Sequence, residues 1–120
     1  MPRNALNGKT VLVAEEESFT ARDIETALEA AGARPYSAES WREVLLLLVQ
    51  QKFDLAVLDM NQGDDNMRRI SSALRRAKIP FVFVSHEPGW PEFRDALLVQ
   101  KPISSHNIVQ ALMGLALKAG

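Results

Sequence analysis

The sequence predicts an α/β fold in which helices cover both faces of a parallel β-sheet. Short runs rich in Val, Leu and Phe recur along the chain, as in strands buried on both faces. Segments with apolar residues at helical spacing separate most of these runs, and strands that alternate with helices form parallel sheets. The length of 120 residues is that of one ordinary domain.

The first half of the chain has clear helix signals between its apolar runs. One helix begins at Ser18, and Gly32 closes it as a C-terminal cap. Ser40 and Glu43 form a capping-box pattern at the start of a second helix. The elements expected in this half are strands at 10–14, 34–37 and 55–59, and helices at 18–31 and 40–51.

The second half continues this alternation with one interruption. After a loop at 61–66, a third helix should bury the apolar residues Met67, Ile70, Ala73, Leu74 and Ala77. Strands follow at 81–85 and 97–100, but the segment between them holds two prolines and a glycine. We therefore expect the fourth helix to be shortened or missing. Ser104 or Ser105 can cap a final helix with Ile108, Leu112 and Leu115 inside.

Five such strands suit a doubly wound, flavodoxin-like sheet with the strand order 2-1-3-4-5. We expect residues 1–120 to form a single domain, with no segment for a separate output domain. Residues 1–9 are expected to form a loose N-terminal arm.

Composition excludes several classes of protein. The net charge of −1 argues against a nucleic-acid binder, and the absence of cysteine excludes disulfides, thiol catalysis and cysteine-bound metal. The sequence has no secretory leader pattern and no apolar run of bilayer-spanning length. We expect a cytoplasmic protein with no membrane contact.

Polar side chains follow the predicted strands where they end, at Glu15, Glu16, Asp59, Ser85 and Lys101. In sheets of this kind, ligands bind at the carboxyl ends of the strands. Clustered carboxylates suit a hard cation such as Mg²⁺, while a lysine and a hydroxyl suit an anion. This combination favours an acyl phosphate, in which the aspartate accepts a phosphoryl group.

Four motifs carry a resemblance to a known family: VLVAEE, DLAVLDMN, PFVFVS and QKP. Together they resemble the CheY-like receiver domain of response regulators in bacterial two-component signalling. The PFVF strand, the FRDA segment and the short fourth helix resemble a subgroup of stand-alone receivers from alphaproteobacteria. The match extends from Thr10 to Pro102, and the final helix extends it to nearly the whole chain.

The resemblance implies a role for each matched residue. Asp59 matches the phosphoryl acceptor, with Ser85 and Lys101 stabilising the phosphoryl oxygens and Ser85 serving as the switch hydroxyl. Glu15, Glu16 and Asp59 match the side chains that hold Mg²⁺, and the backbone carbonyl of Asn61 matches a further ligand.

Further positions match the family's switching and tuning residues. Asn61 and Glu87 lie where the family tunes the rate of phosphate loss. Leu98 replaces the switch aromatic, so the usual aromatic rotamer switch cannot operate. Glu16 stands where Asp is usual, and its extra methylene is expected to weaken Mg²⁺ binding. His86 stands where a small residue is usual and could narrow access.

The predicted function is phosphorelay signalling by protein–protein contact, with no enzyme activity beyond autocatalytic gain and loss of the phosphoryl group. The implied partners are a histidine kinase or a histidine phosphotransfer protein and an output protein. Apolar residues at 44–49, and at Val109, Met113 and Leu117, offer surfaces for a partner or a homodimer. The basic residues between 68 and 78 are expected to form a solvated face, without nucleic-acid binding.

Two alternatives remain open. The first is a degenerate pseudo-receiver, in which Glu16 and His86 prevent phosphorylation and the fold acts as an interaction module. The second is a small phosphatase with Asp59 as nucleophile. It would need a general acid, and the sequence offers only the more distant Asp64.

Overall fold

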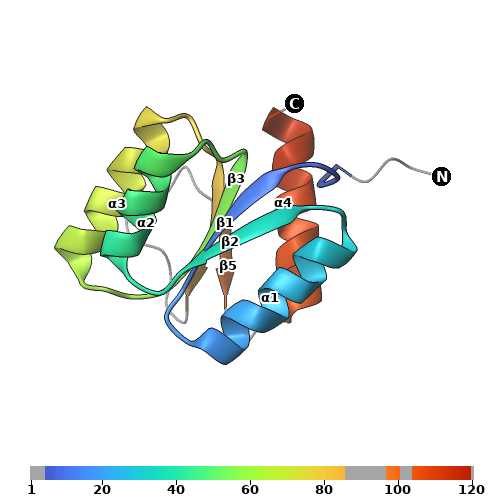
Figure 1. Cartoon of the computed structure of the whole chain (residues 1–120), viewed down its shortest axis with the longest axis horizontal. Coiled ribbons are helices and arrows are strands. Elements are labelled where there is room, and N and C mark those ends of the chain that lie inside the picture. The colour runs from blue at the N-terminus through green and yellow to red at the C-terminus, as the bar shows by residue number, and fades with distance from the viewer. Residues whose placement is uncertain (1–4, 86–96, 101–103, 120) are drawn as a thin grey trace.

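Strands and helices alternate along the chain in the computed structural model (Figure 1). The described residues are 5–85, 97–100 and 104–119, and only the backbone is described for Ser85, Leu97–Gln100 and Ala119. In this part of the chain the elements are β1 (Thr10–Glu15), α1 (Ser18–Ala30), β2 (Arg34–Ala38), α2 (Trp41–Gln50), β3 (Leu55–Asp59), α3 (Asp64–Arg76), β4 (Phe81–Ser85), β5 (Leu97–Gln100) and α4 (Ser105–Ala119).

The strands pair in parallel, in the order β2-β1-β3-β4-β5. The α/β class and the parallel sheet predicted from the sequence are therefore confirmed. Because β1 lies between β2 and β3, its carboxyl end is brought beside that of β3, and Glu15 is the register partner of Asp59. This pairing fixes the position of the candidate site.

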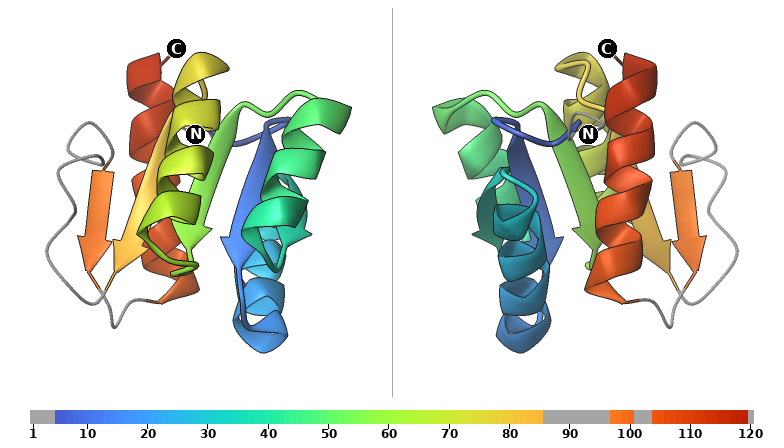
Figure 2. Two further views of the ribbon diagram at one scale, coloured as in Figure 1. Left: turned by 90° about the vertical axis from the view of Figure 1, so that its left-hand side faces the viewer. Right: turned by 90° about the vertical axis from the view of Figure 1, so that its right-hand side faces the viewer.

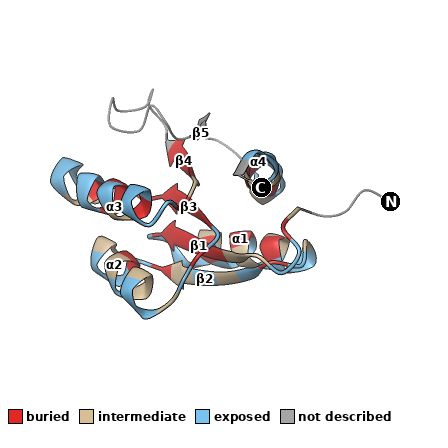
Figure 3. Ribbon diagram, turned by 90° about the horizontal axis from the view of Figure 1, so that it is seen from above, coloured by how far each residue is buried: buried red, intermediate tan, exposed pale blue. Residues whose placement is uncertain are grey.

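Among the described elements, α2 and α3 cover one face of the sheet and α1 and α4 cover the other, as the view from above shows (Figure 3). Side chains alternate between the faces of a strand, so successive residues of β1 enter different cores. Leu12 packs in the core that includes Val44 of α2 and Met67 of α3. Val13 packs in the opposite core, which includes Ile24 of α1 and residues of α4. Each fully buried side chain of this kind stabilises the fold by roughly 1.5–3 kcal/mol.

The ends of the helices follow their sequence signals closely. Ser40 caps α2, where its hydroxyl accepts a hydrogen bond from the Glu43 backbone N–H at 3.3 Å. Ser104, rather than Ser105, caps α4, because its hydroxyl accepts from the Asn107 backbone N–H at 3.2 Å. Gly32 follows α1 with φ of +85°, a conformation that glycine adopts without strain.

Two predictions about buried helix residues need correction. Ala77 was expected inside, but α3 ends at Arg76 and the Ala77 side chain is exposed. Ser71 is buried instead, because it lies one turn after Met67 on the inner face. Val109 was assigned to a second apolar surface of the last helix, yet it is buried in the core beside α1.

The expectation of a loose arm over residues 1–9 is wrong for residues 5–9. Leu6 is fully buried and belongs to the same core as Ile24 and Leu28. The Gly8 backbone N–H donates to the Gly32 carbonyl at 2.8 Å, which ties this turn to the end of α1. The turn is ordered because the Leu6 side chain is buried and the Gly8 backbone is hydrogen-bonded.

The expected shortening of the fourth helix concerns residues 86–96, which lie outside the described residues. None of the described helices combines the length and hydropathy needed to cross a bilayer.

Candidate functional site

The candidate site lies at the carboxyl edge of the sheet. Parallel strands end at the same edge, and the strand arrows in Figure 2 point the same way. Glu15 ends β1, Asp59 ends β3 and Ser85 ends β4. The structure therefore brings three of the predicted site residues to one edge.

Two of these residues are carboxylates that lie buried side by side. Asp59 is 3% exposed and Glu15 is 4% exposed, and they are register partners on neighbouring strands. Glu15 Oε1 accepts a hydrogen bond from the Glu17 backbone N–H at 3.1 Å. Carboxylate oxygens are the ligands that a hard cation such as Mg²⁺ prefers, so this edge of the sheet carries suitable donors for one.

Glu16 differs from this buried pair in its exposure and in its partners. It is exposed, and its carboxylate accepts two hydrogen bonds from the loop after β3. Glu16 Oε1 accepts from the Asn61 backbone N–H at 2.8 Å, and Oε2 accepts from Gln62 Nε2 at 2.9 Å. The sequence predicts that Glu16 and the backbone carbonyl of Asn61 bind the same Mg²⁺. In the structure Glu16 instead accepts a hydrogen bond from the backbone N–H of Asn61.

Gln62 is a part of this edge that the sequence analysis missed. Besides binding Glu16, its side-chain oxygen accepts from the Trp41 backbone N–H at 3.4 Å, at the start of α2. Its backbone carbonyl accepts from Asn66 Nδ2 at 2.9 Å, inside α3. No local pattern could have shown this role, because Glu16 is 46 residues away in the sequence.

The loop around Gln62 is built to turn sharply into α3. Asn61 Oδ1 accepts a hydrogen bond from the Gly63 backbone N–H at 3.2 Å. Gly63 has φ of +91°, and α3 begins at the next residue, Asp64. The side chain of Asn61 thus stabilises the turn that holds its own backbone beside Glu16.

The other predicted site residues are described in part or not at all. The backbone of Ser85 pairs with Gln100, and that of Leu98 pairs with Phe83. Lys101, His86 and Glu87 lie outside the described residues. The roles assigned to these side chains stay predictions.

Mg²⁺ binding also stays a prediction. In the described ranges, no group of three or more His, Cys, Asp or Glu side chains is arranged to hold a metal ion. Glu15 and Asp59 offer the oxygen donors that Mg²⁺ prefers, while Glu16 holds the loop after β3. The oxygen ligands at this edge therefore suit Mg²⁺. Binding of the ion would have to move Glu16 out of its present hydrogen bonds.

Solved structures similar to this chain include several receiver domains. The receiver domain of the Francisella response regulator 1452 has a TM-score of 0.77 at 21% identity, over 94% of this chain and 100% of that one. A response regulator receiver protein from Sinorhizobium medicae has a TM-score of 0.76 at 22% identity, over 95% of this chain and 98% of that one. The anti-anti-sigma factor PhyR of Bartonella quintana has a TM-score of 0.69 at 26% identity, over 93% of this chain but only 48% of PhyR.

No protein-family model matches the sequence, and no curated protein matches it significantly. The structural similarity covers nearly the whole chain and establishes that it has the fold of response-regulator receiver domains. The resemblance inferred from the four sequence motifs is confirmed at the level of the fold.

Proposed function

We propose that the chain is a receiver that accepts a phosphoryl group on Asp59 and signals by contact with other proteins. The observation that carries the proposal is the position of Asp59, buried at the carboxyl end of β3 and in register with Glu15. The receiver fold supports the general role, while phosphorylation and its partners are the proposed part.

The proposed reaction transfers a phosphoryl group from an oxygen or nitrogen atom of the donor to an oxygen atom of Asp59. An Asp59 carboxylate oxygen forms a bond to the phosphorus atom as the donor's bond to it breaks. The donor keeps the electron pair of the broken bond, so an acyl phosphate donor is released as a carboxylate, and a phosphohistidine donor with a protonated ring is released as a neutral imidazole. Lys101 and Ser85 would stabilise the charge on the phosphoryl oxygens.

Mg²⁺ held by Glu15, Asp59 and a repositioned Glu16 would supply positive charge at these oxygens when bound. Burial of Asp59 beside Glu15 would orient the acceptor oxygen and limit the access of water to it. The proposed phosphoryl donor is a histidine kinase or a histidine phosphotransfer protein, in the cytoplasm. The absence of cysteine fits that reducing compartment.

The test is intact-mass spectrometry after incubation with acetyl phosphate, with and without Mg²⁺. We expect a Mg²⁺-dependent gain of one phosphoryl group that is absent in Asp59→Asn. Asp64→Asn is the matched control, because Asp64 is an exposed carboxylate at the start of α3. Equal phosphorylation of Asp59→Asn and the wild type would disprove the assignment of the acceptor.

A second candidate is the pseudo-receiver, and the position of Glu16 favours it. Its two hydrogen bonds to Asn61 and Gln62 hold the carboxylate in the loop after β3. If the wild type gains no phosphoryl group, Glu16→Asp separates the two functions. A Mg²⁺-dependent gain in Glu16→Asp alone would mean that Glu16 keeps an otherwise intact acceptor inactive.

A further inference from the structure

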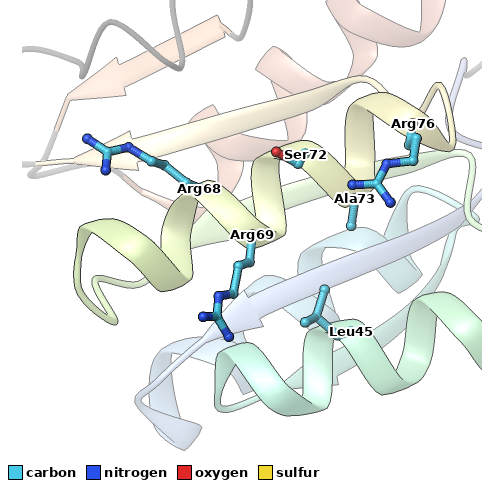
Figure 4. Close-up of a pocket in the computed structure, with 6 residues that line it drawn as sticks. All are labelled: Leu45, Arg68, Arg69, Ser72, Ala73 and Arg76. Carbon is cyan, nitrogen blue, oxygen red and sulfur yellow. The ribbon is translucent and has the colours of Figure 1, made fainter.

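A groove lies between the outer surfaces of α2 and α3, on the face of the molecule that carries these two helices (Figure 4). Its volume is about 390 Å³, and it is open to solvent. We call it the α2–α3 groove. Its lining residues are Leu45, Arg68, Arg69, Ser72, Ala73 and Arg76.

Two arginines of the α2–α3 groove have no acidic partner among the described residues. No carboxylate of the described residues lies within ion-pair distance of Arg69 or Arg76. Arg68 differs, because it pairs with Asp65 at 3.5 Å and points away from the other two (Figure 4). The groove therefore presents two cations to an incoming ligand, and no acidic side chain lines it.

The guanidinium of Arg69 is held in place by an aromatic ring. Its Cζ lies 5.4 Å from the ring centroid of Trp41, and Arg42 Cζ lies 5.1 Å from the same centroid. Contacts of this kind restrict a long side chain before any ligand arrives. A partner would therefore lose less entropy in ordering Arg69 than in ordering a free arginine.

The α2 side of the groove is apolar and continues onto the open surface. Leu45 lines the groove, and Val49, one helical turn further along α2, is 85% exposed. Leu46 beside them is 55% exposed. An apolar strip on one helix thus runs beside two unpaired cations on the next.

We propose that the α2–α3 groove binds an acidic helical segment of a partner protein, with an apolar side chain that enters beside Leu45. Arg69 and Arg76 are seven positions apart on α3, about 10 Å along a helix. Two acidic residues with the same spacing on the partner would reach both guanidinium groups, with leucines between them on the same face. This docking site is independent of phosphorylation at Asp59.

A protein partner fits these observations better than a nucleic acid does. Proteins that bind single strands present open aromatic faces for base stacking along a basic track. Here Arg42 and Arg69 occupy the ring of Trp41, and Asp64 and Asp65 interrupt the basic surface at the start of α3. In addition, the phosphate groups of a nucleic acid would make no favourable contact with the apolar strip on α2.

The test uses the full chain and a synthetic helical peptide of alanine and glutamine that carries two glutamates seven positions apart and two leucines between them. Titration followed by amide chemical shifts should show binding at 45–49 and 68–76. Arg69→Ala and Arg76→Ala should each weaken the binding by about threefold to fivefold, as expected for exposed ion pairs. Arg75→Ala is the matched control, because Arg75 is exposed on α3 outside the groove, and it should have no effect.

Two further peptides separate charge from apolar contact. A peptide with lysine in place of both glutamates should lose binding, and so should a peptide with serine in place of both leucines. The proposal is overturned if the acidic peptide shifts no amide of the groove at millimolar concentration, or if the serine peptide binds equally well. It is also overturned if a DNA oligonucleotide binds more tightly through the same arginines, or if sedimentation shows self-association that Arg69→Glu abolishes.

Discussion

The Asn61 backbone N–H donates a hydrogen bond to Glu16 Oε1 over 2.8 Å, which joins the residue after β1 to the second residue beyond Asp59. Gln62 donates to the other oxygen of the same carboxylate. The loop after β3 therefore competes with any cation for Glu16. If the proposed Mg²⁺ site forms, ion binding must replace or rearrange these hydrogen bonds.

Removing Gln62 should make Mg²⁺ binding tighter. Gln62→Ala deletes one of the two hydrogen bonds that hold Glu16, and such a bond contributes roughly 0.5–1.5 kcal/mol. We expect the dissociation constant for Mg²⁺ to fall about threefold, measured by isothermal titration calorimetry. Gln50→Ala, at an exposed position on α2, serves as the control. An unchanged or weaker affinity in Gln62→Ala would show that the loop does not compete for Glu16.

Leu6 should contribute to stability like a core residue. Leu6→Ala removes a fully buried side chain and should lower the free energy of unfolding by about 2–4 kcal/mol, measured by urea denaturation. Leu46→Ala changes the same side chain at a half-exposed site and should cost less than about 0.5 kcal/mol. Equal effects of the two substitutions would mean that residues 5–9 do not pack in solution.

Gly32 and Gly8 offer a matched test of steric space. Both have positive φ, +85° and +78°, so alanine at either site carries a strain of about 1–2 kcal/mol. A Cβ at Gly32 would also collide with the side chain of Asn7, whereas a Cβ at Gly8 meets nothing within 4 Å. Thermal unfolding should therefore show a larger loss for Gly32→Ala than for Gly8→Ala, and the reverse order would contradict the packing of this turn.

Lys78 is a site where glycine should stabilise the protein. Its φ is +59°, a left-handed conformation that is strained for a residue with a side chain. Lys78→Gly should raise the free energy of unfolding by about 0.5–1 kcal/mol, because the relief of strain exceeds the entropy that glycine loses on folding. Ala77→Gly, at φ of −82°, relieves no strain and should destabilise by a similar amount. A loss of stability in both variants would contradict the conformation at Lys78.

The sequence was informative where the signal was local. The apolar run at Leu55–Asp59 showed a buried strand, and the parallel-sheet rule then placed Asp59 and Glu15 at one edge. Ser40 and Gly32 marked helix ends through hydrogen bonds and backbone angles that depend on adjacent residues.

Contacts between distant residues could not be predicted in this way. Leu6 is a lone large apolar residue in a short segment without strand or helix periodicity, and only the assembled core shows where it packs. The bonds from Asn61 and Gln62 to Glu16 span 45 and 46 residues, so no spacing rule indicates them. Glu16 was expected at a metal, because its type and position were visible while its partners were not.

The central place of β1 has a consequence for how the chain reaches its fold. Val11 of β1 pairs with Pro35 of β2 on one side and with Leu55 of β3 on the other. Both partner strands are synthesised after β1. Pairing between segments so far apart in the sequence slows folding, because the loop must close before the contacts form. Until β3 leaves the ribosome, the run at Thr10–Glu15 keeps an unpaired edge and apolar faces. This strand therefore exposes aggregation-prone apolar surface while the chain is being synthesised.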